Sequence, residues 1–327
     1  MKKIILVLTN SEDGIHSEVV IEKLLKLDEK VFRMDSDRLA KGSIKVLFNS
    51  SQLETEFIFE DKGKSVSSKE IKSVWYRRPN LFNFSIKDPI QKIYAEKEIL
   101  SFLGGLWALL PKDVFWLSNP NSLECSRKKI YQLEMARSFG LKIPKTIISN
   151  NPDDVRDFYK TCNGKIIFKA IYHEFLDYGK KTFNIPTTLV TEKHLENLDL
   201  IRTLPSLFQE YIEKEYELRV TVVGEKIFVV KIDSQKNPFT MVDWRHPDYI
   251  DKLSYTQDEI PNDIANICLK MLKELNLSFG AFDFVVNSKG ELFFLEVNPN
   301  GQWYWLEDKT GVLISDAITN ILKEGGV

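Results

Sequence analysis

The chain has 327 residues, of which 43% are hydrophobic and 28% charged, and its formal net charge is −2. These values describe an ordinary soluble globular protein of two or three packed units, and they argue against a general nucleic-acid binder. No apolar stretch approaches the roughly 20 residues of a membrane span, and three widely spaced cysteines (Cys125, Cys162 and Cys268) fit a reducing cytoplasm better than a disulfide framework or a zinc site.

Residues 1–118 alternate strands and helices, the pattern of an α/β layer domain with a mostly parallel sheet. Strands are predicted at 4–9, 31–34, 57–59 and 73–76, and helices at 15–27 and 88–110. The apolar run 4–8 is too short for the hydrophobic region of a signal peptide, so it is predicted to be a buried strand. Gly104-Gly105 is a candidate break in the second helix.

A second unit, 119–205, begins at a turn and helix-cap cluster around 118–122. Helices are predicted from there to about 139, at 152–162 and at 192–198, and strands at 145–148, 165–171 and 182–191. The polar segment 172–181 is predicted to be a mobile loop.

A third unit, 206–327, has a strand at 207–212, a hairpin of 217–223 with 226–233, and helices at 263–275 and 312–322. A second hairpin joins 281–286 to the strand that ends at Glu296-Val297-Asn298. Counting from its turn places Asp283 nearly opposite Glu296, and Glu296 and Asn298 share one strand face. Two carboxylates and an amide oxygen in apolar strands form a candidate site for one or two Mg²⁺, although an ordinary polar strand end is the alternative.

Acidic residues also follow the strand at 207–212. Glu210, the backbone of Tyr211 and Ile212, and Glu217 supply in order the acceptor, hinge hydrogen bonds and carboxylate that adenine and a ribose diol need. Taken alone, the charge run Glu213-Lys214-Glu215 favours a solvated loop instead.

Several cations occur in apolar surroundings. Arg219 and Lys231 fall on the two strands of one hairpin, where they would neutralise phosphate beside a metal site or form a surface pair. Lys169 ends an apolar strand, whereas Lys129 lies at a helix start where solvation is the simpler interpretation. The sequence has no Walker A or Gly-rich dinucleotide motif, no nucleophile elbow and no kinase set.

In order and spacing, these residues resemble the ATP-grasp ligase superfamily over 119–327. The resemblance implies an α/β N-terminal domain followed by an ATP-grasp fold, in which two α+β subdomains clamp ATP. It also implies that a carboxylate is converted to an acyl phosphate and then attacked by a nucleophile, with release of ADP and phosphate.

A narrower resemblance is to the microviridin-type, or graspetide, peptide maturases. It rests on Val74-Trp75-Tyr76-Arg77-Arg78-Pro79, on 217–224 and 232–235, on Asp243-Trp244-Arg245 and on 296–303. Such enzymes crosslink a ribosomal precursor peptide by joining an Asp or Glu carboxylate to a Thr or Ser hydroxyl or a Lys amine. The resemblance therefore implies a macrocyclase with ATP and Mg²⁺ as cofactors and a leader-plus-core peptide as partner, and it suggests a homodimer.

The resemblance also implies roles for individual residues. Lys129 and Lys169 would contact ATP, Glu210 to Ile212 would hold adenine, and Glu217 the ribose. Asp283, Glu296 and Asn298 would hold Mg²⁺, and Arg219, Lys231 and Arg245 would offset charge on the reacting groups. Arg77 and Arg78 would grip a peptide carboxylate or hold a domain contact, and the leader would bind near 172–191, which includes Glu174, Asp177, Lys180 and Lys181.

Two alternatives remain at this point. One is a carboxylate–amine ligase that adds a free amino acid to a protein or small peptide, which the Trp-Tyr-Arg-Arg-Pro and Asp-Trp-Arg segments disfavour. The other is a catalytically silent nucleotide-binding scaffold, which would be expected to have lost metal or cation ligands. The sequence does not distinguish ester from amide products or identify the precursor.

Overall fold

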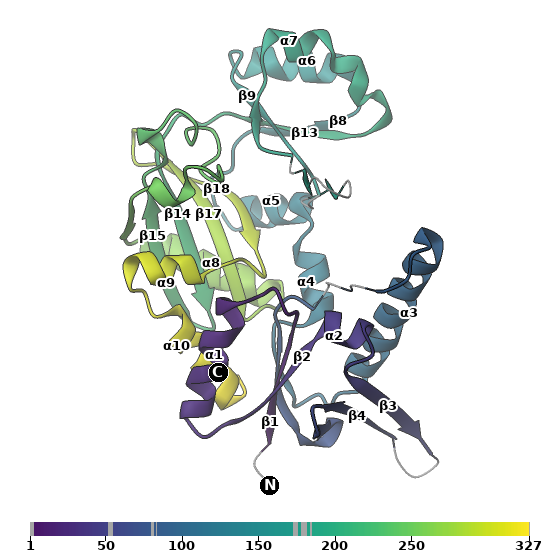
Figure 1. The fold of residues 1–327 in the computed structure, drawn as a ribbon. Coiled ribbons are helices and arrows are strands. Elements are labelled where there is room, and N and C mark those ends of the chain that lie inside the picture. The colour runs from purple at the N-terminus through teal and green to yellow at the C-terminus, as the bar shows by residue number, and fades with distance from the viewer. Residues whose placement is uncertain are drawn as a thin grey trace.

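The computed structural model describes residues 3–51, 55–79, 82, 84–172, 176–177, 182–183 and 185–326. In the orientation of Figure 1, an N-terminal unit lies at the bottom, a central unit at the top, and a C-terminal unit at the left. Within the described residues, no helix is both long and apolar enough to cross a membrane.

The N-terminal unit is built on a parallel sheet of strand order β2-β1-β6-β7. Its strands are β1 (Ile4–Thr9), β2 (Lys30–Asp35), β6 (Ile71–Tyr76) and β7 (Phe115–Leu117). Alternate β1 residues face opposite sides, so Ile5 packs with α1 (Ile15–Lys26) and Leu6 with α3 (Pro89–Ala108). Burial on both faces explains why β1 is a continuous apolar run.

A second, antiparallel sheet lies beside it, of order β3-β4-β5. It contains β3 (Lys45–Ser50), β4 (Thr55–Asp61) and β5 (Lys64–Ser67), and a short helix α2 (Ser36–Ala40) precedes it. The strand predicted at 57–59 is therefore present but does not belong to the parallel sheet. Lys62 and Gly63, with φ of 51° and 75°, form a tight two-residue turn that returns the chain antiparallel. Gly104 and Gly105 do not break α3.

The central unit has an antiparallel sheet of order β12-β9-β13-β8. Its elements are α4 (Pro120–Ser126), α5 (Lys129–Ser138), β8 (Thr146–Ser149), α6 (Pro152–Thr161), β9 (Ile166–Lys169), β10 (Leu176–Asp177), β11 (Thr182–Phe183), β12 (Thr188–Leu189), α7 (Glu192–Glu196) and β13 (Ser206–Glu210).

Two predictions for this unit are wrong. The helix expected to run to 139 is two helices, and the Gln132 side chain donates to the Ser126 carbonyl (2.6 Å) at the junction. The strand expected at 182–191 is divided into β11 and β12, because Pro186 between them lacks a backbone N–H donor. Part of the expected loop 172–181 is the strand β10, which pairs with β11.

The C-terminal unit has an antiparallel sheet of order β16-β15-β14-β17-β18. Its elements are β14 (Lys214–Val223), β15 (Lys226–Ile232), β16 (Tyr255–Gln257), α8 (Asn262–Glu274), β17 (Phe279–Asn287), β18 (Leu292–Asn298), α9 (Tyr304–Thr310) and α10 (Ile314–Glu324), and short 3₁₀ turns occur at Ser68–Glu70, Leu198–Thr203, Ser234–Lys236 and Ile250–Lys252. One sheet face packs on α5 and α8. The lower end of the other face packs with α10 and α1, which joins this unit to the N-terminal one.

Candidate active site

Three oxygen-bearing side chains share one face of the C-terminal sheet. Asp283 on β17 pairs in register with Glu296 on β18, as predicted, and Ala281 pairs with Asn298 two residues further along. Alternate residues of a strand point to the same side, so the three side chains lie on one face. Asp283 and Glu296 are on strands surrounded by apolar partners, and such carboxylates need a charge partner or a metal.

Cations neutralise both carboxylates. Arg219 on β14 is the register partner of Asp283, and its Nη1 lies 2.8 Å from each carboxylate oxygen. Glu296 Oε2 lies 2.6 Å from Lys129 Nζ, the first residue of α5. Glu296 Oε1 lies 3.3 Å from Arg245 Nη1, which comes from the loop between β15 and β16. The central and C-terminal units therefore meet at this charge cluster.

The pKa values follow from this clustering. Burial alone would raise the pKa of Glu296, but Lys129, Arg245 and Lys169 hold it well below its usual range. Burial lowers the pKa of Lys169 to about 8, against the opposing attraction of Glu296. Glu296 is therefore ionised in neutral solution, while Lys169 is poised close to its titration point.

Gln132 fixes the position of β18 against α5. Its amide oxygen accepts from the Val297 N–H (3.0 Å), and its amide nitrogen donates to the Val297 carbonyl (2.8 Å). Val297 lies between Glu296 and Asn298, and Gln132 lies one helical turn after Lys129. This buried pair of hydrogen bonds therefore holds the Lys129–Glu296 contact in place.

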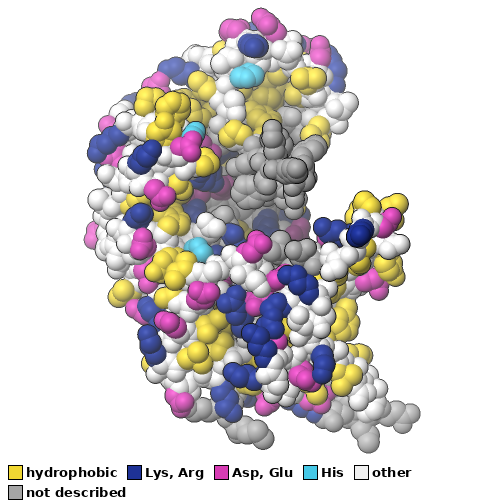
Figure 2. Space-filling view, in the orientation of Figure 1, with side chains coloured by type: hydrophobic (Ala, Val, Ile, Leu, Met, Phe, Trp, Pro, Cys, Tyr) yellow, Lys and Arg dark blue, Asp and Glu magenta, His cyan; other side chains and the backbone are white. Residues whose placement is uncertain are grey.

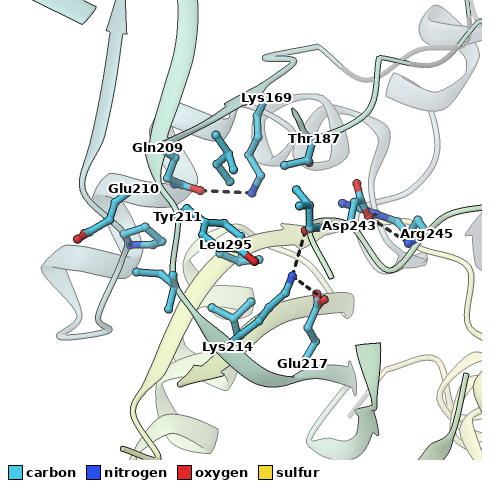
Figure 3. A pocket seen from close by; sticks show the side chains of 15 residues that line it. Lys169, Thr187, Gln209, Glu210, Tyr211, Lys214, Glu217, Asp243, Arg245 and Leu295 are labelled. Atoms are coloured by element: carbon cyan, nitrogen blue, oxygen red, sulfur yellow. Dashed lines mark hydrogen bonds and ion pairs between the residues drawn. The ribbon is translucent and has the colours of Figure 1, made fainter. Parts of the chain in front are cut away.

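A pocket between the central and C-terminal units is lined by residues that were predicted to bind the nucleotide. Lys169 Nζ reaches Gln209 Oε1 (3.3 Å), and Glu210, Tyr211 and Glu217 line the same space, as Figure 3 shows. Glu210 ends β13 and is half-buried near Lys145. The cavity holds about 40 Å³, much less than the roughly 300 Å³ or more of a typical small-molecule site.

Side chains fill part of this pocket. Lys214 Nζ lies 2.8 Å from Glu217 Oε1 and donates to the Val242 carbonyl (3.0 Å), so the predicted ribose carboxylate is already paired. Asp243 lines the same wall and accepts from Arg245 Nε (3.0 Å). Lys214 was not expected at this site, because the charge run 213–215 favours a loop. Strand β14 in fact begins at Lys214.

Lys231 is not part of this cluster, which corrects the prediction. Lys231 pairs with Leu218 whereas Arg219 pairs with Val230, so the two cations point to opposite faces of the sheet. The Lys231 ammonium lies 4.1 Å from the centroid of the Tyr216 ring. Two residues on one hairpin need not share a face of the sheet, because the register of the strands determines which face each side chain occupies.

Arg77 takes the second of its two predicted roles, a contact between units. Its side chain is only 1% exposed, so a peptide cannot reach it directly. Its Nε lies 3.3 Å from Asp13 Oδ1, and its Nη1 donates to the carbonyls of Asn300 (2.9 Å) and Gly301 (3.3 Å). Arg77 thus fixes the N-terminal unit to the loop that follows Asn298.

Gly301 allows this loop to lie close to the charge cluster. A Cβ atom at Gly301 would lie 2.6 Å from Arg219 Nη2 and 3.1 Å from the Ala281 Cβ. Any other residue would displace the Arg219 guanidinium, which is bound to Asp283.

The remaining predicted residues are those expected to contact the substrate peptide. Arg78 keeps an exposed side chain, and its carbonyl accepts from Asn10 Nδ2 (2.6 Å). Glu174, Lys180 and Lys181 lie outside the described residues. Of Asp177 only the backbone, in β10, is described.

The donor set fits a magnesium ion that is shared with a phosphate ligand. No group of three or more His, Cys, Asp or Glu side chains able to hold a metal occurs in the described residues. Mg²⁺, however, is usually held by one or two carboxylates together with substrate phosphates. Asp283 and Glu296, with the Asn298 amide two residues further along β18, provide that smaller set.

Comparisons with known proteins cover the whole chain. Residues 4–124 match the model described as the MvdD pre-ATP grasp domain, and residues 126–322 the model described as the RimK-like ATP-grasp domain. A RiPP-associated ATP-grasp ligase from Chryseobacterium gregarium, solved with ADP and a leader and core peptide, is 29% identical. The alignment covers 99% of this chain and 98% of that one, with a TM-score of 0.91.

Two further relatives are similar. The macrocyclase MdnC from Microcystis aeruginosa MRC, bound with the precursor peptide MdnA, is 30% identical over 98% of this chain and 99% of that one, with a TM-score of 0.86. A probable alpha-L-glutamate ligase from Stutzerimonas stutzeri is 23% identical over 66% of this chain and 69% of its own length.

Glu296→Gln is expected to lower the free energy of unfolding by about 2 kcal/mol at neutral pH, because three cations lose a charged acceptor. The depressed pKa of Glu296 means that its stabilisation is present above the unfolded value of 4.5 and disappears as the pH falls through the lower folded value. Urea unfolding should therefore show a gap between variant and wild type that narrows progressively below pH 4.5. Glu291→Gln, which alters an exposed pair with Lys142, is the control and should change stability little. An equal difference in the free energy of unfolding at all pH values would contradict the assignment of Glu296 as a carboxylate held ionised by these cations.

Arg77→Met is expected to destabilise the protein by about 3–5 kcal/mol, because it leaves the Asp13 carboxylate buried without its cation. Chemical denaturation measures the change, and Arg78→Met, at the exposed neighbouring position, is the matched control with little expected effect. Similar losses for the two variants would show that Arg77 does not fix the units together.

Proposed function

The chain belongs to the RimK-like ATP-grasp domain family, and we propose that it uses ATP to crosslink side chains of a ribosomally made precursor peptide. The match over the whole chain confirms the expected ATP-grasp fold behind an N-terminal domain of the pre-ATP-grasp type, and the resemblance to peptide macrocyclases. The observation that carries the proposal is this full-length similarity to two peptide-bound enzymes, combined with the complete charge cluster of Asp283, Glu296, Arg219 and Lys129.

The reaction we propose has two steps. An Asp or Glu carboxylate oxygen of the peptide attacks the γ-phosphorus of ATP, and ADP leaves. A Thr or Ser hydroxyl, or a Lys amine, then attacks the acyl carbon, and phosphate leaves with the former carboxylate oxygen while one proton is released. Such chemistry depends on positioning and charge stabilisation, and it requires no nucleophilic enzyme side chain.

The geometry supports roles for the residues around the pocket. Lys129 and Lys169 lie beside Glu296 and would contact the phosphates, while Arg219 and Arg245 would offset charge on the reacting groups. Asp283, Glu296 and Asn298 would hold Mg²⁺, for which we propose two ions. Bound by these residues, Mg²⁺ would act as a Lewis acid that offsets the negative charge of the nucleotide phosphates.

Nucleotide binding requires rearrangement of the pocket. Glu217 can accept the ribose hydroxyls only after its pair with Lys214 is broken, and the hinge at Glu210 to Ile212 must accommodate adenine in a space of about 40 Å³. Figure 2 shows a hollow in the surface between the upper lobe and the rest of the molecule. We infer that the central unit moves away from the C-terminal sheet when ATP enters.

The partners are proposed in part from the resemblance. The substrate would be a leader-plus-core peptide, with the leader near 172–191. The homodimer, the absence of nucleic-acid binding and the domain boundaries after 118 and 205 stay predictions.

The similarity to a probable glutamate ligase supports a second candidate, the addition of a free amino acid to a protein or peptide. A catalytically silent scaffold is disfavoured, because both carboxylates and their cation partners are present.

Intact-mass analysis distinguishes these functions. A candidate precursor peptide encoded beside this gene, incubated with the protein, ATP and Mg²⁺, should lose the mass of one water molecule per bond. Mild base should hydrolyse ester bonds and leave amides. An Asp283→Asn, Glu296→Gln double variant should abolish the change, because both carboxylate ligands are removed.

The other outcomes assign the chain differently. A gain in mass with added amino acids would establish the amino-acid ligase. Bound ATP with no product would indicate either a wrong precursor or the silent scaffold. Crosslinking by the double variant would show that the two carboxylates are not required for catalysis.

ATP binding is expected to weaken as the pH rises, because Lys169, with its pKa near 8, loses its charge. Between pH 7 and pH 9 the apparent affinity should fall by about tenfold if only the protonated form binds the phosphates. Lys169→Met should bind weakly throughout and lose this pH dependence. Lys165→Met, at the exposed end preceding β9, is the control and should retain it; retention in Lys169→Met would exclude Lys169 from the phosphate site.

A further inference from the structure

A second cavity lies away from the nucleotide pocket, between α3 and the C-terminal end of β6. Its volume is about 200 Å³, and Phe82, Leu100, Leu103 and Trp107 form most of its apolar wall. Small-molecule sites usually hold about 300–1,000 Å³, so this space is smaller than a typical ligand site and has room for one apolar side chain. Leu100 is 47% exposed at the rim, which shows that the cavity communicates with the surface.

Gly104 forms part of the cavity wall within the helix α3. Glycine in a helix interior costs roughly 0.5–1 kcal/mol relative to alanine. The backbone does not require it here, because Gly104 has no positive φ and a Cβ atom would meet nothing within 4 Å. Gly104 is exposed and lines the cavity, so a longer side chain at this position has room to extend over the cavity opening.

Two arginines adjoin the cavity wall: Arg78 directly precedes Pro79, which lines the cavity, and Arg127 follows helix α4, whose residues Pro120 and Asn121 line it. Arg78 and Arg127 both have exposed side chains, and neither forms an ion pair with the described part of the chain. Partial desolvation lowers the pKa of Arg78, Asp13 opposes this, and the nearby charge of Arg127 lowers it further. Arg127 also acts on Tyr76, which lines the cavity. The Asp13 carboxylate is already paired with Arg77, so the exposed guanidinium groups of Arg78 and Arg127 leave positive charge available to an acidic ligand.

Hydrogen bonds connect the cavity wall to the proposed reaction site. Tyr76 lines the cavity, and its carbonyl accepts from Asn300 Nδ2 (3.3 Å). Asn300 follows the candidate metal ligand Asn298 by two residues, and its backbone N–H donates to the Asn298 amide oxygen (3.4 Å). A peptide with one side chain in the cavity would thus pass close to Asn298.

We propose that this cavity is a subsite for the substrate peptide, which receives an apolar side chain while Arg78 and Arg127 hold an acidic side chain beside it. The inference rests on the proposed function and deepens it, since it predicts which sequence the enzyme accepts: an apolar residue near a reacting Asp or Glu. Apolar burial would supply affinity, and the arginine pair would select the acid.

Two adjacent glycines provide a matched test. Gly104→Leu places a side chain over the cavity opening, whereas Gly105→Leu places the same side chain at a neighbouring helix position that also has free space and does not line the cavity. With the encoded precursor peptide as probe, Gly104→Leu should raise the KM for peptide by about tenfold or more, the loss expected when one apolar side chain is no longer buried. The kcat and the KM for ATP should change less than twofold, and Gly105→Leu should resemble wild type in all three.

The charged half of the subsite is tested in the same assay. Arg78→Gln and Arg127→Gln should each raise the KM for peptide and reduce its dependence on salt. A peptide in which the apolar residues flanking the reacting acids are changed to Ala should bind wild type as weakly as the original peptide binds Gly104→Leu.

Several results would overturn the subsite. The two leucine variants could raise the KM for peptide equally, or Gly104→Leu could leave it unchanged. Light scattering could also show a changed oligomeric state in Gly104→Leu alone, which would assign this face to a second copy of the chain. If wild type leaves the peptide uncrosslinked, the proposed function fails separately. In that case, fluorescence anisotropy of labelled peptide tests the subsite by itself. Weaker peptide binding by Gly104→Leu but not by Gly105→Leu would support the subsite. Unchanged binding by Gly104→Leu, or no binding by wild type, would reject it.

Discussion

The arrangement of the units depends on how two desolvated carboxylates are neutralised. Asp283 and Glu296 lie on adjacent apolar strands, where an unpaired charge costs several kcal/mol. Arg219 balances the first, and Lys129 with Arg245 balances the second, so three segments distant in sequence must converge on β17 and β18. The same requirement that holds the units together produces a site rich in fixed charges of both signs, which suits phosphoryl transfer.

Each unit contributes to the geometry of that cluster. The central unit supplies Lys129 from the start of α5, and Gln132 locks the helix against β18. The N-terminal unit acts indirectly: Arg77 holds the loop at Asn300 and Gly301, and this loop lies directly against Arg219. We infer that the N-terminal domain sets the position of the reaction site in addition to presenting Arg78 to the substrate.

The sequence predicted features that depend on local pattern and register. The hairpin with its short turn brings Asp283 close to Glu296, but a register shift between Asp283 and Phe284 makes the two residues direct partners. The apolar run of β1 follows from burial on both sheet faces. The sequence could not predict that Lys214 pairs with Glu217, or that Lys231 lies on the opposite sheet face from Arg219. Each depends on where β14 begins and how it pairs with β15. The burial of Arg77 likewise depends on Asn300, more than 200 residues away, and no local signal distinguishes it from the exposed Arg78.

The central claim is that this charge cluster converts a peptide carboxylate into an acyl phosphate before the crosslink forms. Labelling the Asp and Glu carboxylates of the precursor with oxygen-18 tests it directly. Each bond formed should transfer one labelled oxygen to the released phosphate, which mass spectrometry of that phosphate detects. Unlabelled phosphate from a reaction that nonetheless yields crosslinked peptide would exclude an acyl phosphate intermediate.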